Sequence, residues 1–180
     1  MPFQPGERVM GKRLIPTILI AAGVLLAVTS AAYWQFRSAI DNPGIADVPE
    51  TIAGLSLSQA SYGLDAVSEV TRLHEKSFPL SSGTAAMYGQ SGEMVMLWVT
   101  GTPAQPLATK MIADMETAIG KTKSPFTPVG VRNISDRAVY ELNGMGQKHF
   151  YFQSAASVIW LAADEPIAEI TLAEALDFYP

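Results

Sequence analysis

The stretch LIPTILIAAGVLLAVTSAAYWQF, residues 14–36, decides how this chain is organised, because none of its 23 side chains is charged. As a helix it would reach about 34 Å, enough to cross a hydrocarbon core of about 30 Å. Cations and amphipathic rings, which are typical of membrane interfaces, stand at its two ends: Lys12, Arg13, Tyr33, Trp34 and Arg37. We therefore expect a transmembrane helix over 14–36, with these five residues as interfacial anchors.

The charges on either side of the span predict its orientation. Arg8, Lys12 and Arg13 precede the span, whereas Arg37 alone follows closely. The positive-inside tendency then places the N-terminus in the cytoplasm and the larger C-terminal part outside it, as in a periplasmic domain. The alternative is a cleaved signal peptide, because residues 30–32 offer small side chains in an A-x-A-like pattern. The apolar run is longer than a usual signal-peptide core, which favours a retained signal-anchor, and both interpretations export the domain.

A row of small residues gives the span a candidate packing face. Gly23, Ala27 and Ala31 follow one another at intervals of four and so share one side of a helix. Small residues at this spacing allow a second helix to approach closely within a bilayer. We expect this row to contact another membrane helix; the alternative is coincidence, because glycine and alanine are common in membrane spans.

Composition divides the rest of the chain and excludes several functions. We expect a cytoplasmic tail over 1–13, a linker over 37–50 that is rich in proline and acids, and a domain over 51–180. From residue 38 onward there are 16 acidic against 8 basic side chains, so a nucleic-acid partner is not expected. The chain has no cysteine, which excludes disulfides, thiolate catalysis and iron–sulfur ligation.

Hydrophobic periodicity predicts an α+β domain. Apolar residues at helical spacing predict helices over 65–76, 103–119 and 166–179. Strands are predicted over 52–57, 84–88, 94–100, 129–134, 138–142, 149–153 and 158–162, most of them in hairpins. The expected architecture has two layers, an antiparallel sheet with helices on one face. Because the runs 94–99 and 158–162 are apolar on both sides of a strand, the outer face should be covered by a helix or a partner.

The two halves of the domain resemble each other at an offset of 63 residues. Both contain a strand, a Gln-Ser turn, a second strand and a helix that begins at proline. The matched residues are Tyr88, Gln90, Ser91, Val95 and Pro103 with Tyr151, Gln153, Ser154, Val158 and Pro166. They suggest two ββα-type repeats, although any two ββα units share turn and helix-start residues for physical reasons alone.

No residue pattern predicts catalysis, a cofactor or a metal. The two histidines, His74 and His149, are far apart and lack metal-ligand spacing. Ser154, His149 and Asp164 could form a nucleophile set only on paper, because no nucleophile elbow accompanies them. The glycines of 143–146 indicate a tight turn. Acidic residues are also concentrated in the last 20 residues. An exposed helix face is a simpler interpretation of them than a docking surface for a basic partner or a cation site. The methionines at 87, 94, 96, 111, 115 and 145 are expected to fill the core.

Two hypotheses about function follow. The first is a single-pass membrane protein whose extracytoplasmic domain binds other proteins, as an accessory or assembly subunit of a membrane complex. Its partners would be the lipid bilayer and other membrane subunits. The second is a ligand-binding or sensing domain with an apolar pocket for a small molecule, lined by Trp98, Trp160, Phe150 and Tyr140. Neither hypothesis makes the protein an enzyme.

Overall fold

The computed structural model describes residues 8–74, 78–89, 92–121 and 124–180. The chain divides into two compact units, residues 1–38 and residues 39–180, each described here by itself. The first unit is formed by the long helix α1, Arg8–Asp41, whose last residues belong to the second. Among the described residues α1 alone is long and apolar enough to cross a membrane, with a mean hydropathy of 2.1 over its apolar window. Such a helix is compatible with a membrane anchor and equally with a signal sequence.

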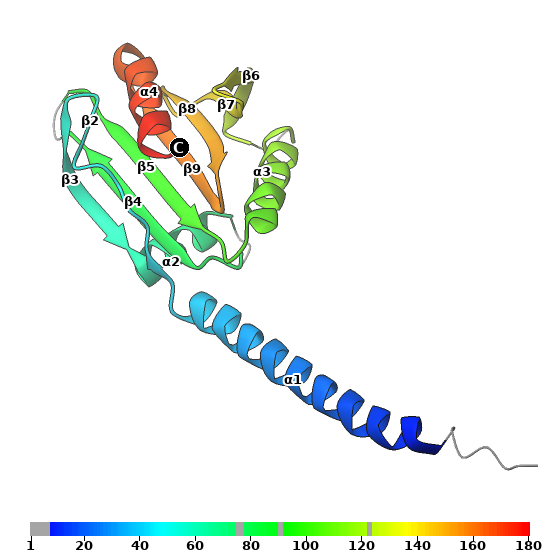
Figure 1. The fold of residues 1–180 in the computed structure, drawn as a ribbon. Coiled ribbons are helices and arrows are strands. Elements are labelled where there is room, and N and C mark those ends of the chain that lie inside the picture. Colours follow the sequence, from blue (N-terminus) through cyan, green and yellow to red (C-terminus); the bar gives the residue numbers. More distant parts are fainter. Residues whose placement is uncertain (1–7, 75–77, 90–91, 122–123) are drawn as a thin grey trace, which may run out of the picture. The chain divides into compact units, whose positions relative to one another are not determined.

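The second unit is an α+β domain built on one large sheet (Figure 1). The strand order is β2-β3-β4-β5-β9-β8-β7-β6, and every neighbouring pair on this path is antiparallel. The short strand β1 pairs with β4 in parallel. The strands are β1 Gly44–Ile45, β2 Thr51–Ile52, β3 Leu55–Tyr62, β4 Ser82–Tyr88, β5 Val95–Gly101, β6 Phe126–Ile134, β7 Arg137–Gly144, β8 Gln147–Ser154 and β9 Ser157–Ala163. The helices are α2 Gly63–His74, α3 Gln105–Ile119, the 3₁₀ turn η1 Glu165–Ile167 and α4 Ala168–Phe178.

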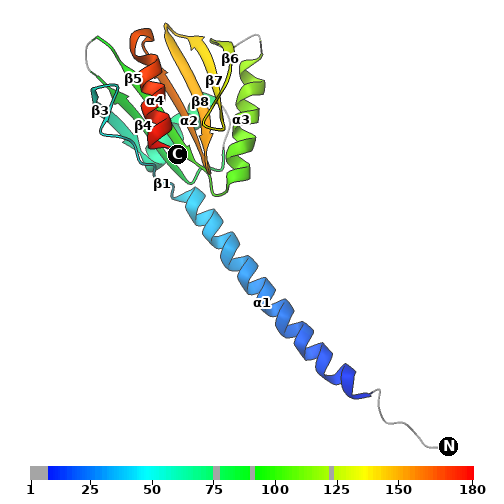
Figure 2. The ribbon, with the colours of Figure 1, turned by 45° about the horizontal axis from the view of Figure 1, so that its top comes forward.

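Helices cover both faces of this sheet, so the expectation of helices on one face is wrong. Leu97, Phe150 and Leu161 point toward α4 and form one core with its apolar side. Side chains from the alternate positions, among them Tyr151 and Val158, form a second core with α2 and α3. We call these sides the α4 face and the α2/α3 face; Figures 1 and 2 show α4 on one side of the strands and α2 on the other. The runs 94–99 and 158–162, which are apolar on both sides of a strand, are thus covered by helices on both sides.

The predicted 63-residue repeat is not confirmed by the arrangement of its matched residues. Tyr88 and Val95 belong to the α4 face, whereas their counterparts Tyr151 and Val158 belong to the α2/α3 face. The central strands β5 and β9 are antiparallel neighbours, and a two-fold axis relating them would keep matched residues on one face. Both halves do have the ββα order, while Gln90 and Ser91 lie outside the described residues.

The segment expected as a linker, 37–50, is structured. Residues 37–41 continue α1, and the backbone at 44–45 pairs with β4. Beyond them, the Thr84 hydroxyl donates to the Ala46 carbonyl at 2.6 Å and accepts from its N–H at 3.2 Å. The Tyr88 hydroxyl donates to the Pro49 carbonyl at 2.8 Å. A backbone without regular periodicity is thus held by side-chain hydroxyls of the sheet.

Two ends of secondary structure are closed by specific contacts. Met145 and Gly146, both with positive φ, form the two-residue turn between β7 and β8, as expected for a tight turn at 143–146. At the C-terminus the Arg137 guanidinium donates to the Leu176 and Tyr179 carbonyls. A cation is favourable there because the last carbonyls of a helix have no partner within the helix.

Candidate functional site

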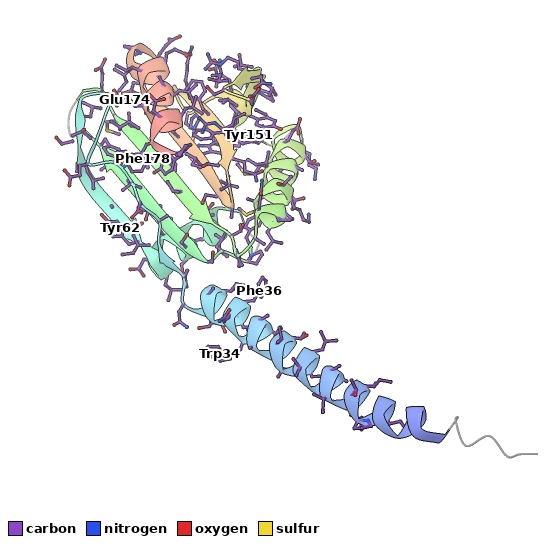
Figure 3. All side chains as sticks on the ribbon, viewed as in Figure 1. Trp34, Phe36, Tyr62, Tyr151, Glu174 and Phe178 are labelled. Carbon is purple, nitrogen blue, oxygen red and sulfur yellow. The ribbon has the colours of Figure 1, made fainter. Side chains whose placement is uncertain are left out.

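A row of aromatic rings crosses the α2/α3 face. Tyr140, Tyr151 and Trp160 occupy paired positions on β7, β8 and β9. Tyr140 and Tyr151 stack with centroids 4.5 Å apart, and Tyr151 and Trp160 stack at 5.4 Å, each pair 8° from parallel. Trp98 on β5 is the register partner of Trp160 and extends the row. Figure 3 shows Tyr151 on the side of the sheet toward α3, and this ring is buried.

His149 is held in this row as a neutral ring. Its Nδ1 accepts a hydrogen bond from Trp160 Nε1 at 3.2 Å, so its Nε2 is the donor toward the Gly144 carbonyl at 2.9 Å. Phe126 packs edge-on against the same imidazole, with centroids 4.8 Å apart. Burial lowers the pKa of His149, partly opposed by the hydrogen bond to Gly144. A ring with both nitrogens engaged is part of the packing and has no free nitrogen for catalysis or metal binding.

The lowered pKa of His149 predicts that the domain loses stability in mild acid. The unfolded chain takes up this proton near pH 6.5 and the folded chain at lower pH, so the free energy of unfolding falls as the pH drops below about 6.5. Below the folded-state pKa the loss is complete. Urea denaturation of residues 39–180 at several pH values measures the slope. The variant His149→Gln should lose that part of the slope, and equal slopes in both proteins would contradict the assignment.

A shallow hollow of about 150 Å³ lies beside the aromatic row, on strands β3, β4 and β5 next to α2. Met87, Met96 and Trp98 provide most of its apolar floor, and Gln59, Ser61 and Glu69 provide its polar side. The Ser61 hydroxyl donates to the Glu69 carboxylate at 3.4 Å, which fixes the acid at the wall. Trp98 Nε1 is buried, and no described residue accepts a hydrogen bond from it. We call this feature the Trp98 hollow.

The hollow coincides with an incompletely covered part of the central sheet. On strands β4 and β5 the side chains of the α4 face, such as Ala86 and Leu97, are buried. Their neighbours on the α2/α3 face, Met87, Met96 and Trp98, are only partly buried. This part of the strands therefore has an apolar surface that the domain's own helices leave incompletely covered.

The four residues predicted to line one pocket do not surround a single cavity. Trp98, Trp160 and Tyr140 share the α2/α3 face, but Phe150 is fully buried on the α4 face. The guanidinium of Arg132 lies 5.4 Å from the centroid of Phe150 on that side. Of the four, only Trp98 lines the hollow. Strand alternation already separates Phe150 from Tyr151, and that signal was available in the sequence.

No protein-family model, curated protein or solved structure matches this chain. The α2/α3 face is therefore assessed on its chemistry. It combines stacked rings, thioethers and one wall carboxylate, and the described residues contain no group of three acids, histidines or cysteines placed to hold a metal ion. The groups that border the hollow suit the binding of an apolar partner with a basic or hydrogen-bonding group.

Ser154, His149 and Asp164, considered above as a possible nucleophile set, have separate structural roles. His149 is engaged by Trp160 and Gly144, as described above. The Ser154 hydroxyl donates to the Pro180 carbonyl at 2.6 Å. The Asp164 carboxylate accepts from the Met94 N–H at 2.8 Å and from Gln147 at 3.0 Å. These contacts do not bring the three side chains together.

Several of the crowded C-terminal acids tie α4 to the domain. Glu169 forms an ion pair with Arg132 at 3.0 Å, and the Glu174 carboxylate accepts the Ala53 N–H at 2.7 Å. Ala53 has positive φ in the turn between β2 and β3, so this contact anchors that hairpin on α4. With Asp164 occupied as well, the acids at 165 and 177 are the ones for which no contact is described here. An exposed helix face and these contacts together account for the concentration of acids in this segment.

The predicted residues of the span all lie in α1. Gly23 has nothing within 4 Å of an added Cβ, and Tyr33 and Trp34 are exposed. The side chains of Lys12 and Arg13 lie outside the described part of the chain. The packing face and the interfacial anchors therefore remain predictions. Among the methionines, Met111 is buried as expected, whereas Met145 is 79% exposed in its turn.

Proposed function

We propose that this protein is anchored in the cell membrane by α1 and uses an extracytoplasmic domain to bind another protein. In this role it is an accessory or assembly subunit of a membrane complex. The observation that supports the proposal most is the Trp98 hollow, where incompletely covered apolar sheet surface lies next to a carboxylate. Exposed apolar surface rimmed by polar groups is typical of protein-binding sites.

The size of the hollow favours a protein over a small molecule as its occupant. Pockets for drug-sized ligands usually measure about 300–1,000 Å³ and enclose most of the ligand. The hollow has about 150 Å³ and is lined by strands of one sheet and one helix. A side chain projecting from a larger partner fits this volume, while the rest of the partner covers the surrounding surface.

The chemistry of the hollow specifies the contacting segment. Glu69 is the only charged residue among those lining it, and no lysine or arginine accompanies it. A basic side chain of the partner would therefore pair with this carboxylate, and apolar neighbours would cover the methionines. We infer a partner segment that combines apolar residues with a lysine or arginine.

Charge reversal in the hollow tests this function. Extraction of the full chain from its membrane in mild detergent, followed by mass spectrometry, identifies the proteins that copurify with it. Glu69→Lys should deplete them about tenfold or more, because losing one charge-assisted contact of about 1.4 kcal/mol already has that effect. Asp177→Lys is the matched control, since it makes the same charge change at an exposed position of α4.

Three results would count against the proposal that the hollow binds a protein. One is an unchanged set of copurifying proteins in Glu69→Lys while the domain keeps its circular dichroism spectrum. The other is a small molecule retained by the protein in place of any subunit, which would support the ligand-binding hypothesis instead. Copurification lost equally in both lysine variants would indicate a general charge effect and would also count against the hollow.

A further inference from the structure

Three large apolar side chains are exposed where the chain enters the domain. Ile45 in β1 is 66% exposed, Tyr62 at the end of β3 is 42% exposed, and Leu64 at the start of α2 is 60% exposed. Figure 3 shows Tyr62 at the end of the sheet where β3 leads into α2. We call these three residues the junction patch.

Strand register places the three residues close together. Ile45 pairs with Gly83 and Tyr62 pairs with Thr84, so both lie beside consecutive residues of β4. Leu64 follows two residues after Tyr62. At the intervening Gly63, an added Cβ would lie 3.0 Å from the carbonyl of Pro43, so the two segments are in contact here.

Chain connectivity keeps the junction patch near the end of α1. Ile45 follows Asp41, the last residue of the helix, by four residues, which span at most about 14 Å. From Phe36 at the end of the uncharged run, the helix rises about 7.5 Å to Asp41. That rise is close to the headgroup layer, about 5–7 Å thick on each side of the hydrocarbon. An inserted α1 would therefore end near the outer limit of the headgroups. The four residues from Asp41 to Ile45 would then keep the patch within about 14 Å of that point.

The charges around the patch decide which lipid chemistry it can use. Residues 38–65 contain four acids and no lysine or arginine. With Arg37 directly before it, this stretch still has a net charge of −3, so charge gives it no attraction to anionic headgroups. Apolar and tyrosine side chains insert at the boundary of headgroups and acyl chains without needing charge.

We propose that the junction patch rests in the interfacial layer of the bilayer that α1 spans and binds zwitterionic phospholipid through Ile45, Tyr62 and Leu64. The inference rests on the proposed anchoring role of α1. It gives the domain a second, non-covalent contact with the lipid, at the end of the sheet that contains β1. The turn between β7 and β8 lies at the opposite end of the sheet. Ser82, next to β1, is in register with Gly101 and Ser157 at one end. Tyr88 is in register with Val95 and Ala163 at the other end, where Ala163 pairs with Lys148 beside the turn.

The absence of cysteine from the chain makes a site-specific test straightforward. The full chain is reconstituted in phosphatidylcholine vesicles with an environment-sensitive fluorophore on a single introduced cysteine, and quenching by brominated lipid is measured. Leu64→Cys and Ile45→Cys should give blue-shifted emission that loses most of its intensity with brominated lipid. Met145→Cys, also highly exposed but in the β7–β8 turn, is the matched control and should keep its intensity.

A fourth probe separates this inference from the anchor itself. Val24→Cys, in the middle of the span, should be quenched whenever α1 is inserted. If Val24 is quenched while Leu64 and Ile45 behave like Met145, the patch does not contact lipid and the anchor stands. If Val24 is not quenched, anchor and patch both fail. Quenching at Leu64 that requires added anionic lipid would also overturn the proposal, because the acidic surroundings predict the opposite dependence.

Discussion

Replacing Trp160 with alanine should lower the free energy of unfolding of residues 39–180 by about 3 kcal/mol. Trp160 is in a central strand, stacks on Tyr151, packs edge-on against Phe126 at 5.1 Å and donates to His149. Its truncation removes these contacts and leaves a buried imidazole nitrogen without its donor. Because the indole is partly rather than fully buried, we expect a loss at the lower end of the usual range for tryptophan. Urea denaturation followed by circular dichroism measures the change.

Two further variants identify the source of that loss. Trp160→Phe keeps a ring in the row but removes the donor to His149 and part of the ring volume, so it should cost less than Trp160→Ala, about 1–2 kcal/mol. Ile170→Ala changes an exposed residue of α4 and should stay within about 0.5 kcal/mol of the natural chain. If Trp160→Ala were no more destabilising than Ile170→Ala, the aromatic row would not contribute to the core.

A reporter enzyme that is active only outside the cytoplasm should be active when fused after Pro180. Three cations precede the span and one follows closely, so the C-terminal side is the one expected to cross the membrane. Fusion of a reporter that works only in the cytoplasm should be silent at the same position. Replacing Arg8, Lys12 and Arg13 with asparagine removes the asymmetry and should reduce the external signal. The reverse pattern of reporter activities would overturn the proposed topology.

Much of the α+β character could be predicted from the sequence, because it depends on local periodicity. The predicted helix at 103–119 and α3 overlap almost completely, and the hairpins of 84–100 and 149–162 are present. The layers could not be predicted, because an amphipathic helix shows that it has an apolar side but not which face of a sheet it covers. The apolar positions of 94–99 pointed to cover on both sides, and the structure provides that cover with α4 and with α2 and α3.

The candidate functional surface was harder to predict than the fold. The order in residues 43–50 comes from Thr84, Tyr88 and Tyr179, which lie far away in sequence. The Trp98 hollow depends on how much of β4 and β5 the helix α2 leaves uncovered. The extent of that coverage cannot be predicted from the sequence of either strand. A partial signal was present, since Met87 and Met96 alternate with buried residues on strands already covered by α4. No such signal was present for Glu69, because an acidic side chain on a helix is ordinarily exposed to solvent.

The hydrogen bond from the Tyr179 hydroxyl to the Asp47 carbonyl, 2.8 Å long, joins residues 132 positions apart. It connects nearly the last residue of the chain to the segment that follows α1, while Arg137 holds the same C-terminal turn. A chain still emerging from the ribosome therefore lacks the residues that close its first folded segment. The central pairing of β5 with β9 must wait in the same way, since β9 begins at Ser157. Folding of the domain is consequently a late event that requires synthesis through Tyr179, and a chain that lacks Tyr179 would leave this closure unmade.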